Sequence, residues 1–245
     1  MYFPGLVLFL YVLVSSQSVD CHLHVVSSAV PGNSSYDLIS RVQDDIVSQQ
    51  SDLVVMMVGT NDMVNSSKLS SYQEFSNNIE QLIKHFQKNN IDLVLVSPPP
   101  VDSIYLFKRH NPKLFDDSPN VRLRKARDIL ASKSKDHGIV FIDVFNLFKQ
   151  QQIPDHNKDS VIRNYSNSGV HDGVHPTSIG YKMIADQICK VLLSKRKNLK
   201  RNTRIICFGD SITWGVGVIG EGTAAGETYP AFLKNRLCAN QILGR

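Results

Sequence analysis

Ile205-Ile-Cys-Phe-Gly-Asp-Ser-Ile-Thr213 is the stretch of sequence that decides the fold. Its first four residues are continuously apolar, which favours a short buried strand. Gly209 and Asp210 then permit a sharp turn, so we expect the hydroxyl of Ser211 to project at the carboxyl end of that strand. The competing interpretation is that Asp210 or Ser211 merely caps a helix or turn, as such residues often do.

Short apolar runs alternate with amphipathic stretches along the rest of the chain. The expected strands cover residues 22–27, 52–58, 91–97, 139–143 and 204–208. The expected helices cover residues 36–47, 71–88, 120–136, 177–193 and 227–237. This order predicts an α/β fold with a doubly wound parallel sheet. In such a sheet ligands bind beyond the carboxyl ends of the strands, so the loops there are the places to look for chemistry.

The composition is that of an ordinary globular protein. Hydrophobic residues make up 42% of the 245 residues and charged residues 20%, which argues against disorder and against a multi-span membrane protein. The net charge is +5, and its excess is concentrated in residues 195–204. We interpret that basic stretch as a solvated linker. No aromatic platform or groove-reading motif accompanies it, so we expect no nucleic-acid partner.

The N-terminus predicts export. Residues 1–14 are continuously apolar but too short to span a bilayer as a helix, and the small polar run 15–18 follows them. A signal peptide over residues 1–18 is therefore expected, with a secreted or periplasmic protein that has no stable membrane association after processing. Because no Lys or Arg precedes the apolar run, a buried terminal segment or an uncleaved anchor remains an alternative. Residues 19–245 are expected to form a single domain.

Asp172-Gly-Val-His175 places a carboxylate and an imidazole on one short loop. Serine attacks an acyl carbon only if a base takes its proton, and a neutral histidine oriented by a carboxylate is the usual base. A tight turn at Gly173 lets Asp172 reach the near ring nitrogen of His175, which leaves the far nitrogen free to face Ser211. Taken alone, a surface histidine near an aspartate is more often an incidental pair.

Gly32 and Asn61 are candidates for stabilising the oxyanion that such an attack creates. Gly32 would offer a backbone N–H that substrate can approach because no side chain covers it, and Asn61 would offer its amide. Losing one donor of this kind typically costs about 100-fold to 1,000-fold in rate. For each residue taken singly, a turn glycine or a turn asparagine is a sound alternative.

Taken together, these motifs resemble the four sequence blocks of the SGNH/GDSL hydrolase family. The blocks are Gly209-Asp-Ser-Ile-Thr213, Gly32, Gly59-Thr-Asn-Asp62 and Asp172-Gly-Val-His-Pro176. The resemblance implies a flavodoxin-like sheet, no metal or organic cofactor, and hydrolysis of esters or thioesters through an acyl-enzyme. It further implies that Ser211 is the nucleophile, His175 the base and Asp172 its orienting group. Ser211, Gly32 and Asn61 are then the oxyanion donors.

The order of the blocks departs from that family. The nucleophile block comes last here instead of first, as expected of a circular permutant in which residues 194–203 link the usual final helix to the usual first strand. The new chain ends are then neighbours. Cys21 and Cys238 bracket the break, so a disulfide between them could staple the ends. Cys189 and Cys207 lie on apolar patterns and are expected to be buried free thiols.

The function we expect is hydrolysis of short-chain or carbohydrate O-acyl (such as acetyl) esters by a serine esterase. Acyl transfer, lysophospholipase and thioesterase activities are variants of the same chemistry. Two alternatives stand beside it: a non-catalytic remnant or binding domain of the same fold, and an incomplete product of two tandem domains. A metal ion is not expected, because Cys21, His22 and His24 lack the spacing of a familiar tetrahedral site.

Overall fold

A five-stranded parallel sheet forms the centre of the protein, described here by a computed structural model for residues 22–195, 199 and 202–243. The strands are β1 (His24–Ala29), β2 (Leu53–Met57), β3 (Asp92–Val96), β4 (Val140–Ile142) and β5 (Arg204–Gly209). Their order across the sheet is β1-β5-β2-β3-β4, and every neighbouring pair is parallel. The last strand along the chain therefore lies between the first and the second.

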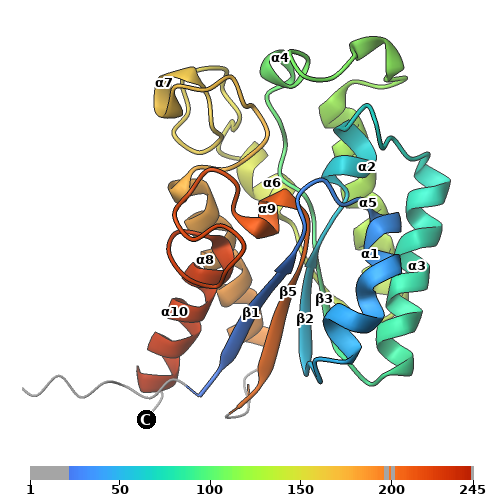
Figure 1. Ribbon diagram of the computed structural model, residues 1–245, viewed down its shortest axis with the longest axis vertical. Coiled ribbons are helices and arrows are strands. Elements are labelled where there is room, and N and C mark those ends of the chain that lie inside the picture. Colours follow the sequence, from blue (N-terminus) through green and yellow to red (C-terminus); the bar gives the residue numbers. More distant parts are fainter. Residues whose placement is uncertain (1–21, 196–198, 200–201, 244–245) are drawn as a thin grey trace, which may run out of the picture.

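Helices cover both faces of this sheet (Figure 1). The longer ones are α1 (Ser35–Val42), α3 (Tyr72–Lys88), α5 (Pro119–Asp136), α8 (Ser178–Lys195) and α10 (Tyr229–Leu243). The shorter ones are α2 (Thr60–Val64), α4 (Ser103–Leu106), α6 (Val144–Lys149), α7 (Tyr165–Ser168) and α9 (Ser211–Trp214). A π-helical turn, Gln43–Val47, continues α1, and a 3-10 turn, Pro112–Leu114, precedes α5.

The strand β5 shows why both faces are covered. Its side chains alternate between two buried clusters, because successive residues of a strand point to opposite faces. Ile205 and Cys207 pack with α8 and α10, whereas Ile206 and Phe208 pack with α1, α3 and α5. Every residue from Ile205 to Phe208 is at most 1% exposed. A strand that is apolar on both faces is stable only between two helical layers.

The predicted doubly wound α/β fold is confirmed, and its strand order is of the flavodoxin-like kind. If β5 is counted first and β1 to β4 follow, the order across the sheet reads 2-1-3-4-5, which is the flavodoxin-like order. The predicted strands differ from the observed ones by at most two residues at either end. The helix predicted over residues 36–47 is observed as α1 followed by the π-helical turn.

Several predictions fall wholly or partly on residues that the structure does not describe. The signal peptide over residues 1–18 and the cysteine at position 21 lie outside the described residues, as do five positions of the expected linker, 196–198, 200 and 201. Cys238 is disulfide-bonded, and Cys189 and Cys207 are buried free thiols as expected. Within the described ranges no helix is both long and apolar enough to cross a membrane.

Candidate active site

The carboxyl end of β5 leads directly into the turn that carries Ser211. Asp210 caps the short helix α9 through a 2.9 Å hydrogen bond from the N–H of Ile212 to its carboxylate. Ser211 is the first residue of α9 and is 8% exposed. A side chain at Gly209 would collide with the Thr213 hydroxyl and with the backbone of β2. The capping interpretation is thus correct for Asp210, and the cap places Ser211 at the end of the strand.

Ser211, His175 and Asp172 lie within hydrogen-bonding distance in one chain. The Nε2 atom of His175 is 3.0 Å from the Ser211 hydroxyl oxygen. The other ring nitrogen, Nδ1, is 2.8 Å from one carboxylate oxygen of Asp172 and 3.0 Å from the second. An ionised carboxylate only accepts, so Nδ1 carries the hydrogen and Nε2 is left as a lone-pair acceptor facing the serine.

Asp172 is held in its ionised form. Burial opposes ionisation, but hydrogen bonding and electrostatic attraction from His175 outweigh it, and the backbone N–H groups of His175 and Val174 add to the effect. The pKa of Asp172 therefore lies well below its usual value. The same two N–H groups donate to Oδ1 at 3.0 and 2.9 Å. Arg109 donates from Nη2 to the Asp172 carbonyl at 2.7 Å and reaches the carboxylate at 3.3 Å.

The loop that carries Asp172 and His175 is fixed by its neighbours. Gly173 has a φ of +76°, and a Cβ there would lie 2.7 Å from the Asp102 carbonyl oxygen. The Gly173 carbonyl accepts a 2.7 Å hydrogen bond from the N–H of Asp102, and the N–H of Gly173 donates to the Arg163 carbonyl at 2.9 Å. The N–H of Arg163 donates to the His175 carbonyl, also at 2.9 Å. The predicted tight glycine turn is present and is bonded on both sides.

The two further oxyanion candidates, Gly32 and Asn61, line the same pocket as Ser211 and His175. Gly32 has a φ of +81°, with open space where a Cβ would stand. Among the described residues, no acceptor takes the backbone N–H of Gly32 or of Ser211. Asn61 is engaged: its amide nitrogen donates to the Asn33 carbonyl at 3.0 Å and lies 3.4 Å from an Asp210 carboxylate oxygen. The contact of the Asn61 amide with Asp210 is long at 3.4 Å, so the hydrogen it uses is the one available to the oxyanion of a substrate.

Two carboxylates are buried beneath the site. Burial raises the pKa of Asp210 to about 6, partly offset by the hydrogen bond from Ile212 and by attraction to His175, while repulsion from Asp62 adds to the rise. Burial also raises the pKa of Asp62. Asp62 accepts hydrogen bonds from the N–H of Ser35 at 3.0 Å and from the Ser35 hydroxyl. It therefore holds the start of α1 beside the site.

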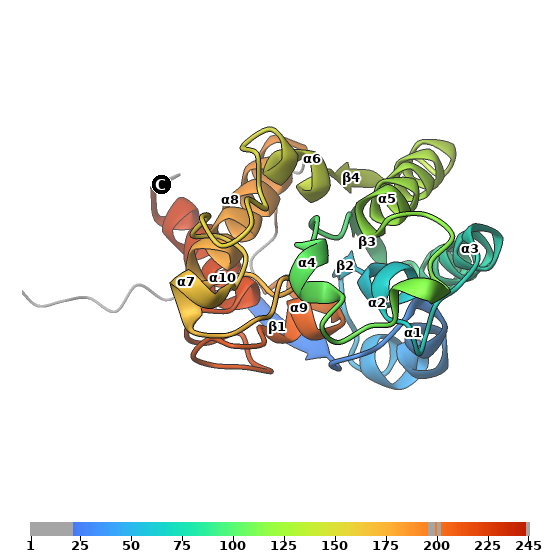
Figure 2. The ribbon, with the colours of Figure 1, turned by 90° about the horizontal axis from the view of Figure 1, so that it is seen from above.

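The pocket over Ser211 is small, with a volume of about 250 Å³. Seen from above, α2, α4 and α9 lie around this end of the sheet (Figure 2). The lining comprises Pro31, Gly32, Thr60, Asn61, Val64, Asn65, Leu106, Arg109, His110, Val174, His175, Ser211 and Val216. Pockets that bury a drug-sized ligand measure roughly 300–1,000 Å³, so the pocket over Ser211 lies below that range.

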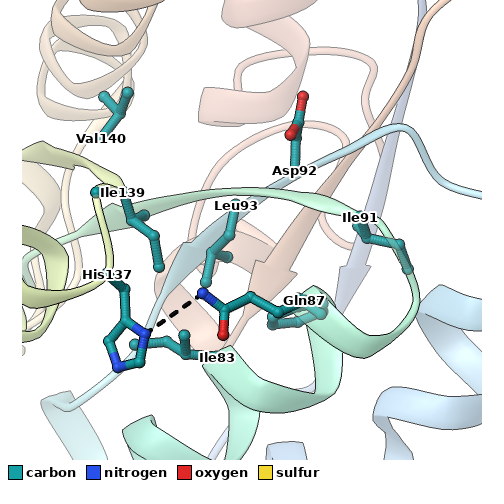
Figure 3. Close-up of a pocket in the computed structure, with 10 residues that line it drawn as sticks. Ile83, Gln87, Ile91, Asp92, Leu93, His137, Ile139 and Val140 are labelled. Atoms are coloured by element: carbon teal, nitrogen blue, oxygen red, sulfur yellow. Dashed lines mark hydrogen bonds between the residues drawn. The ribbon is translucent and has the colours of Figure 1, made fainter.

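A second pocket lies at the opposite end of the sheet and holds none of the predicted site residues (Figure 3). Its volume is about 210 Å³, and residues at the starts of β3 and β4 line it. Within it, His137 lies 3.4 Å from Gln87. Because chemistry in this fold gathers at the carboxyl ends of the strands, the pocket over Ser211 is the candidate site. In the described part of the chain, no group of three or more His, Cys, Asp and Glu residues is placed to hold a metal ion.

Three arginines around the site have structural roles that were not predicted from the sequence. Arg109 contacts the Asp172–His175 loop through its side chain and Arg163 contacts it through its backbone. Arg41, on α1, donates to the Gly209 carbonyl at 2.8 Å, to the Asn33 side chain at 2.7 Å, and stacks over the Phe208 ring. It therefore joins the glycine loop after β1 to the turn that carries the nucleophile candidate.

Comparison with known proteins identifies the family of this chain and finds solved structures with the same fold. The GDSL-like lipase/acylhydrolase family matches residues 8–188. The chain belongs to this family, which makes it a hydrolase and, at the level of the family, an ester hydrolase. The matched range contains Gly32, Asn61, Asp172 and His175 but ends before Ser211. A search of curated proteins found no match.

Solved structures of GDSL hydrolases share the fold. A GDSL-like lipase from Bacteroides thetaiotaomicron is 21% identical, with a TM-score of 0.52 over 67% of this chain and 73% of that one. The lipase/acylhydrolase from Enterococcus faecalis is 18% identical, with a TM-score of 0.51 over 67% and 73%. An acetylxylan esterase from Geobacillus stearothermophilus is 16% identical, with a TM-score of 0.51 over 66% and 68%.

Proposed function

We propose that this protein is a serine carboxylic-ester hydrolase that works through an acyl-enzyme, with Ser211 as the nucleophile. One observation carries the proposal: Nε2 of His175 lies 3.0 Å from the Ser211 hydroxyl while Asp172 holds Nδ1 at 2.8 Å. This is the relay of nucleophile, base and orienting group that acyl transfer requires. Because all three residues come from one chain, the arrangement also favours an active enzyme over a remnant whose site has come apart.

In the first half of the reaction, Ser211 Oγ attacks the acyl carbon as His175 Nε2 takes the hydroxyl proton. The charge that develops on the carbonyl oxygen is stabilised by the N–H groups of Ser211 and Gly32 and by the Asn61 amide. The tetrahedral intermediate then collapses, and the C–O bond to the alcohol breaks. The imidazolium of His175 gives its proton to the departing alkoxide, which leaves an acyl group on Ser211.

In the second half, water repeats the attack. His175 takes a proton from the water as its oxygen adds to the acyl carbon, and the same donors stabilise the oxyanion. Collapse releases the carboxylic acid and returns the proton to Ser211. An alcohol or sugar hydroxyl in place of water would give acyl transfer through the same steps.

We propose short-chain esters, including acetyl groups carried on carbohydrates, as the substrates. The small pocket over Ser211 supports a short acyl group. Among the solved structures that share the fold, several are described as acetylxylan or acetyl-xylooligosaccharide esterases.

We further propose that residues 19–245 are one circularly permuted domain and that the protein is exported. The position of β5 between β1 and β2 supports permutation, because the strand that leads to Ser211 occupies the central place although it comes last. Activity that follows a monomer peak in size-exclusion chromatography would support the single domain. Activity confined to dimers would favour two partial domains that complete each other.

The proposal that the protein is exported rests on the apolar residues 1–14.

Replacement of the nucleophile tests the function. Ser211→Ala should abolish turnover of p-nitrophenyl acetate and labelling by a fluorophosphonate probe while leaving the circular dichroism spectrum unchanged. Ser132→Ala is the matched control, because Ser132 lies on α5, where its hydroxyl bonds Asp136 at an exposed position. Turnover that survives Ser211→Ala would refute the assignment, and so would labelling at another serine.

A further inference from the structure

Two nitrogen-bearing side chains on one wall of the pocket take no part in the proposed relay of Ser211, His175 and Asp172. Arg109 and His110 follow α4, and both line the pocket that contains Ser211 and His175. Among the described residues that line this pocket, none is an Asp or a Glu. The lining therefore offers hydrogen-bond donors and positive charge. Among the described residues, the carboxylate that reaches Arg109 is that of Asp172, at 3.3 Å, and Asp172 does not line the pocket.

Arg109 has donors to spare. A guanidinium carries five N–H groups in a rigid planar fork. The hydrogen bonds that Arg109 makes to the carbonyl and to the carboxylate of Asp172 both use Nη2. Within the described part of the chain, no acceptor takes the hydrogens on Nε or Nη1. The side chain is 41% exposed and lines the pocket, so it is accessible to a ligand that enters there.

His110 is fixed as a donor by its neighbour. Its Nδ1 atom lies 3.2 Å from the backbone N–H of Ser66, which can only donate. Nδ1 therefore accepts, and in the neutral ring the hydrogen is on Nε2. Burial and the nearby charge of Arg109 lower the pKa of His110, so the neutral ring is the relevant one near neutral pH. The imidazole adds an N–H donor to the same wall as the guanidinium.

We infer that Arg109 and His110 bind a carboxylate carried by the ester substrate. Both side chains donate here, and a carboxylate is a group that only accepts and that matches the planar fork of arginine. The counter-charge that Arg109 has in Asp172 is 3.3 Å away and is shared with His175, so a substrate carboxylate would add a second counter-charge that a neutral hydroxyl lacks. The inference rests on the proposed esterase function and narrows its substrate class to anionic esters, with the carboxylate on either the acyl or the alcohol side.

The test compares one neutral ester with two anionic ones. p-Nitrophenyl acetate is neutral, mono-p-nitrophenyl succinate carries the carboxylate on the acyl side, and 4-acetoxybenzoate carries it on the alcohol side. The wild-type enzyme should show a higher kcat/KM for one anionic ester than for p-nitrophenyl acetate, after correction for the uncatalysed rates. Which ester is preferred identifies the side of the bond that faces Arg109.

The variants separate recognition from positioning. The quantity compared is the ratio of kcat/KM for the preferred anionic ester to kcat/KM for the neutral ester. Arg109→Gln should lower this ratio by about tenfold. That is the low end of the range for a charge-assisted hydrogen bond, because the site is partly exposed. His110→Phe should lower the ratio by a smaller factor. Lys108→Gln is the control: it removes the same charge one residue away, but Lys108 lies over the Tyr105 ring and is not among the lining residues.

Several results would overturn the inference. If Arg109→Gln slows both classes of ester equally, the residue only positions Asp172. If the wild-type enzyme prefers neither anionic ester, or if Lys108→Gln lowers the ratio as much, no carboxylate is recognised at this wall. Titration calorimetry measures the affinity for the two anionic esters in the absence of turnover, with the Ser211→Ala variant compared with the Ser211→Ala, Arg109→Gln double variant. Equal affinities there would also count against it. A wild-type enzyme that turns over none of the three esters would instead refute the esterase function, and turnover that survives Ser211→Ala would refute Ser211 as the nucleophile.

Discussion

Replacing Asp172 by asparagine is the sharpest perturbation of the proposed relay, because it exchanges one carboxylate oxygen for an NH2 group and leaves the shape of the side chain unchanged. Oδ1 of Asp172 accepts from the N–H groups of Val174 and His175 at 2.9 and 3.0 Å. The asparagine side chain keeps those bonds only if its own oxygen stays there. Its NH2 group then takes the place of Oδ2, 2.8 Å from Nδ1 of His175.

Two donors cannot face each other, so the imidazole must change its tautomer. Nδ1 then accepts from the asparagine, and the hydrogen moves to Nε2, which lies 3.0 Å from Ser211. The lone pair that should take the serine proton is lost. In serine hydrolases this change typically lowers kcat by about 10⁴-fold, which corresponds to about 5.4 kcal/mol in the activation free energy. The backbone bonds survive, so we expect the melting temperature to change by less than about 5 °C.

Steady-state hydrolysis of p-nitrophenyl acetate measures the effect, with differential scanning fluorimetry on the same samples. Asp186→Asn is the matched control, since Asp186 is an aspartate on α8 whose carboxylate pairs with Arg236 and lies outside the lining of the pocket over Ser211. It should leave kcat within about twofold, as expected for a surface ion pair. If Asp172→Asn is folded and retains kcat within about tenfold of the wild type, the tautomer argument is wrong.

Two further predictions concern Asn61 and Asp210. Asn61→Ala should lower kcat for p-nitrophenyl acetate by about 100-fold to 1,000-fold with little change in KM, because an oxyanion donor acts mainly in the transition state. A loss in kcat below about threefold in the same assay would contradict that role. Asp210→Asn should stabilise the fold more at pH 8 than at pH 5. Burial raises the folded pKa of Asp210 from 3.8 to about 6, so the unfolded chain ionises first and stability is lost as the pH rises through this range. Thermal melts at both pH values measure the difference, and equal gains would exclude a buried charge as the cause.

Most of the sheet could be predicted because its strands are buried on both faces. A run such as residues 204–208 has no charged side chain after its first residue, and β5 is observed over Arg204–Gly209. The loop with Asp172 and His175 was equally accessible to prediction. Its contact spans three residues, and a glycine turn leaves few ways to arrange them. Local chemistry alone therefore indicates that this carboxylate and this imidazole meet.

Contacts between distant parts of the chain could not be predicted in this way. Arg41 bonds the carbonyl of Gly209, which lies 168 residues further along the chain. Arg109 reaches Asp172 across 63 residues. Neither arginine stands in a pattern that distinguishes it from a surface residue. The short helices α2, α4, α7 and α9 span four or five residues each, too few for a helical period to show in the sequence.

The central place of β5 has a consequence for synthesis of the protein. Among the described strands β1 pairs with β5 alone, and β2 pairs with β5 and β3. A ribosome therefore releases β1 to β4 before the strand that must lie between β1 and β2. Until residues 204–209 emerge, the nascent sheet has an open gap, and the serine that completes the site arrives after its partners. The sheet and the site are therefore complete only after the last segment has been released.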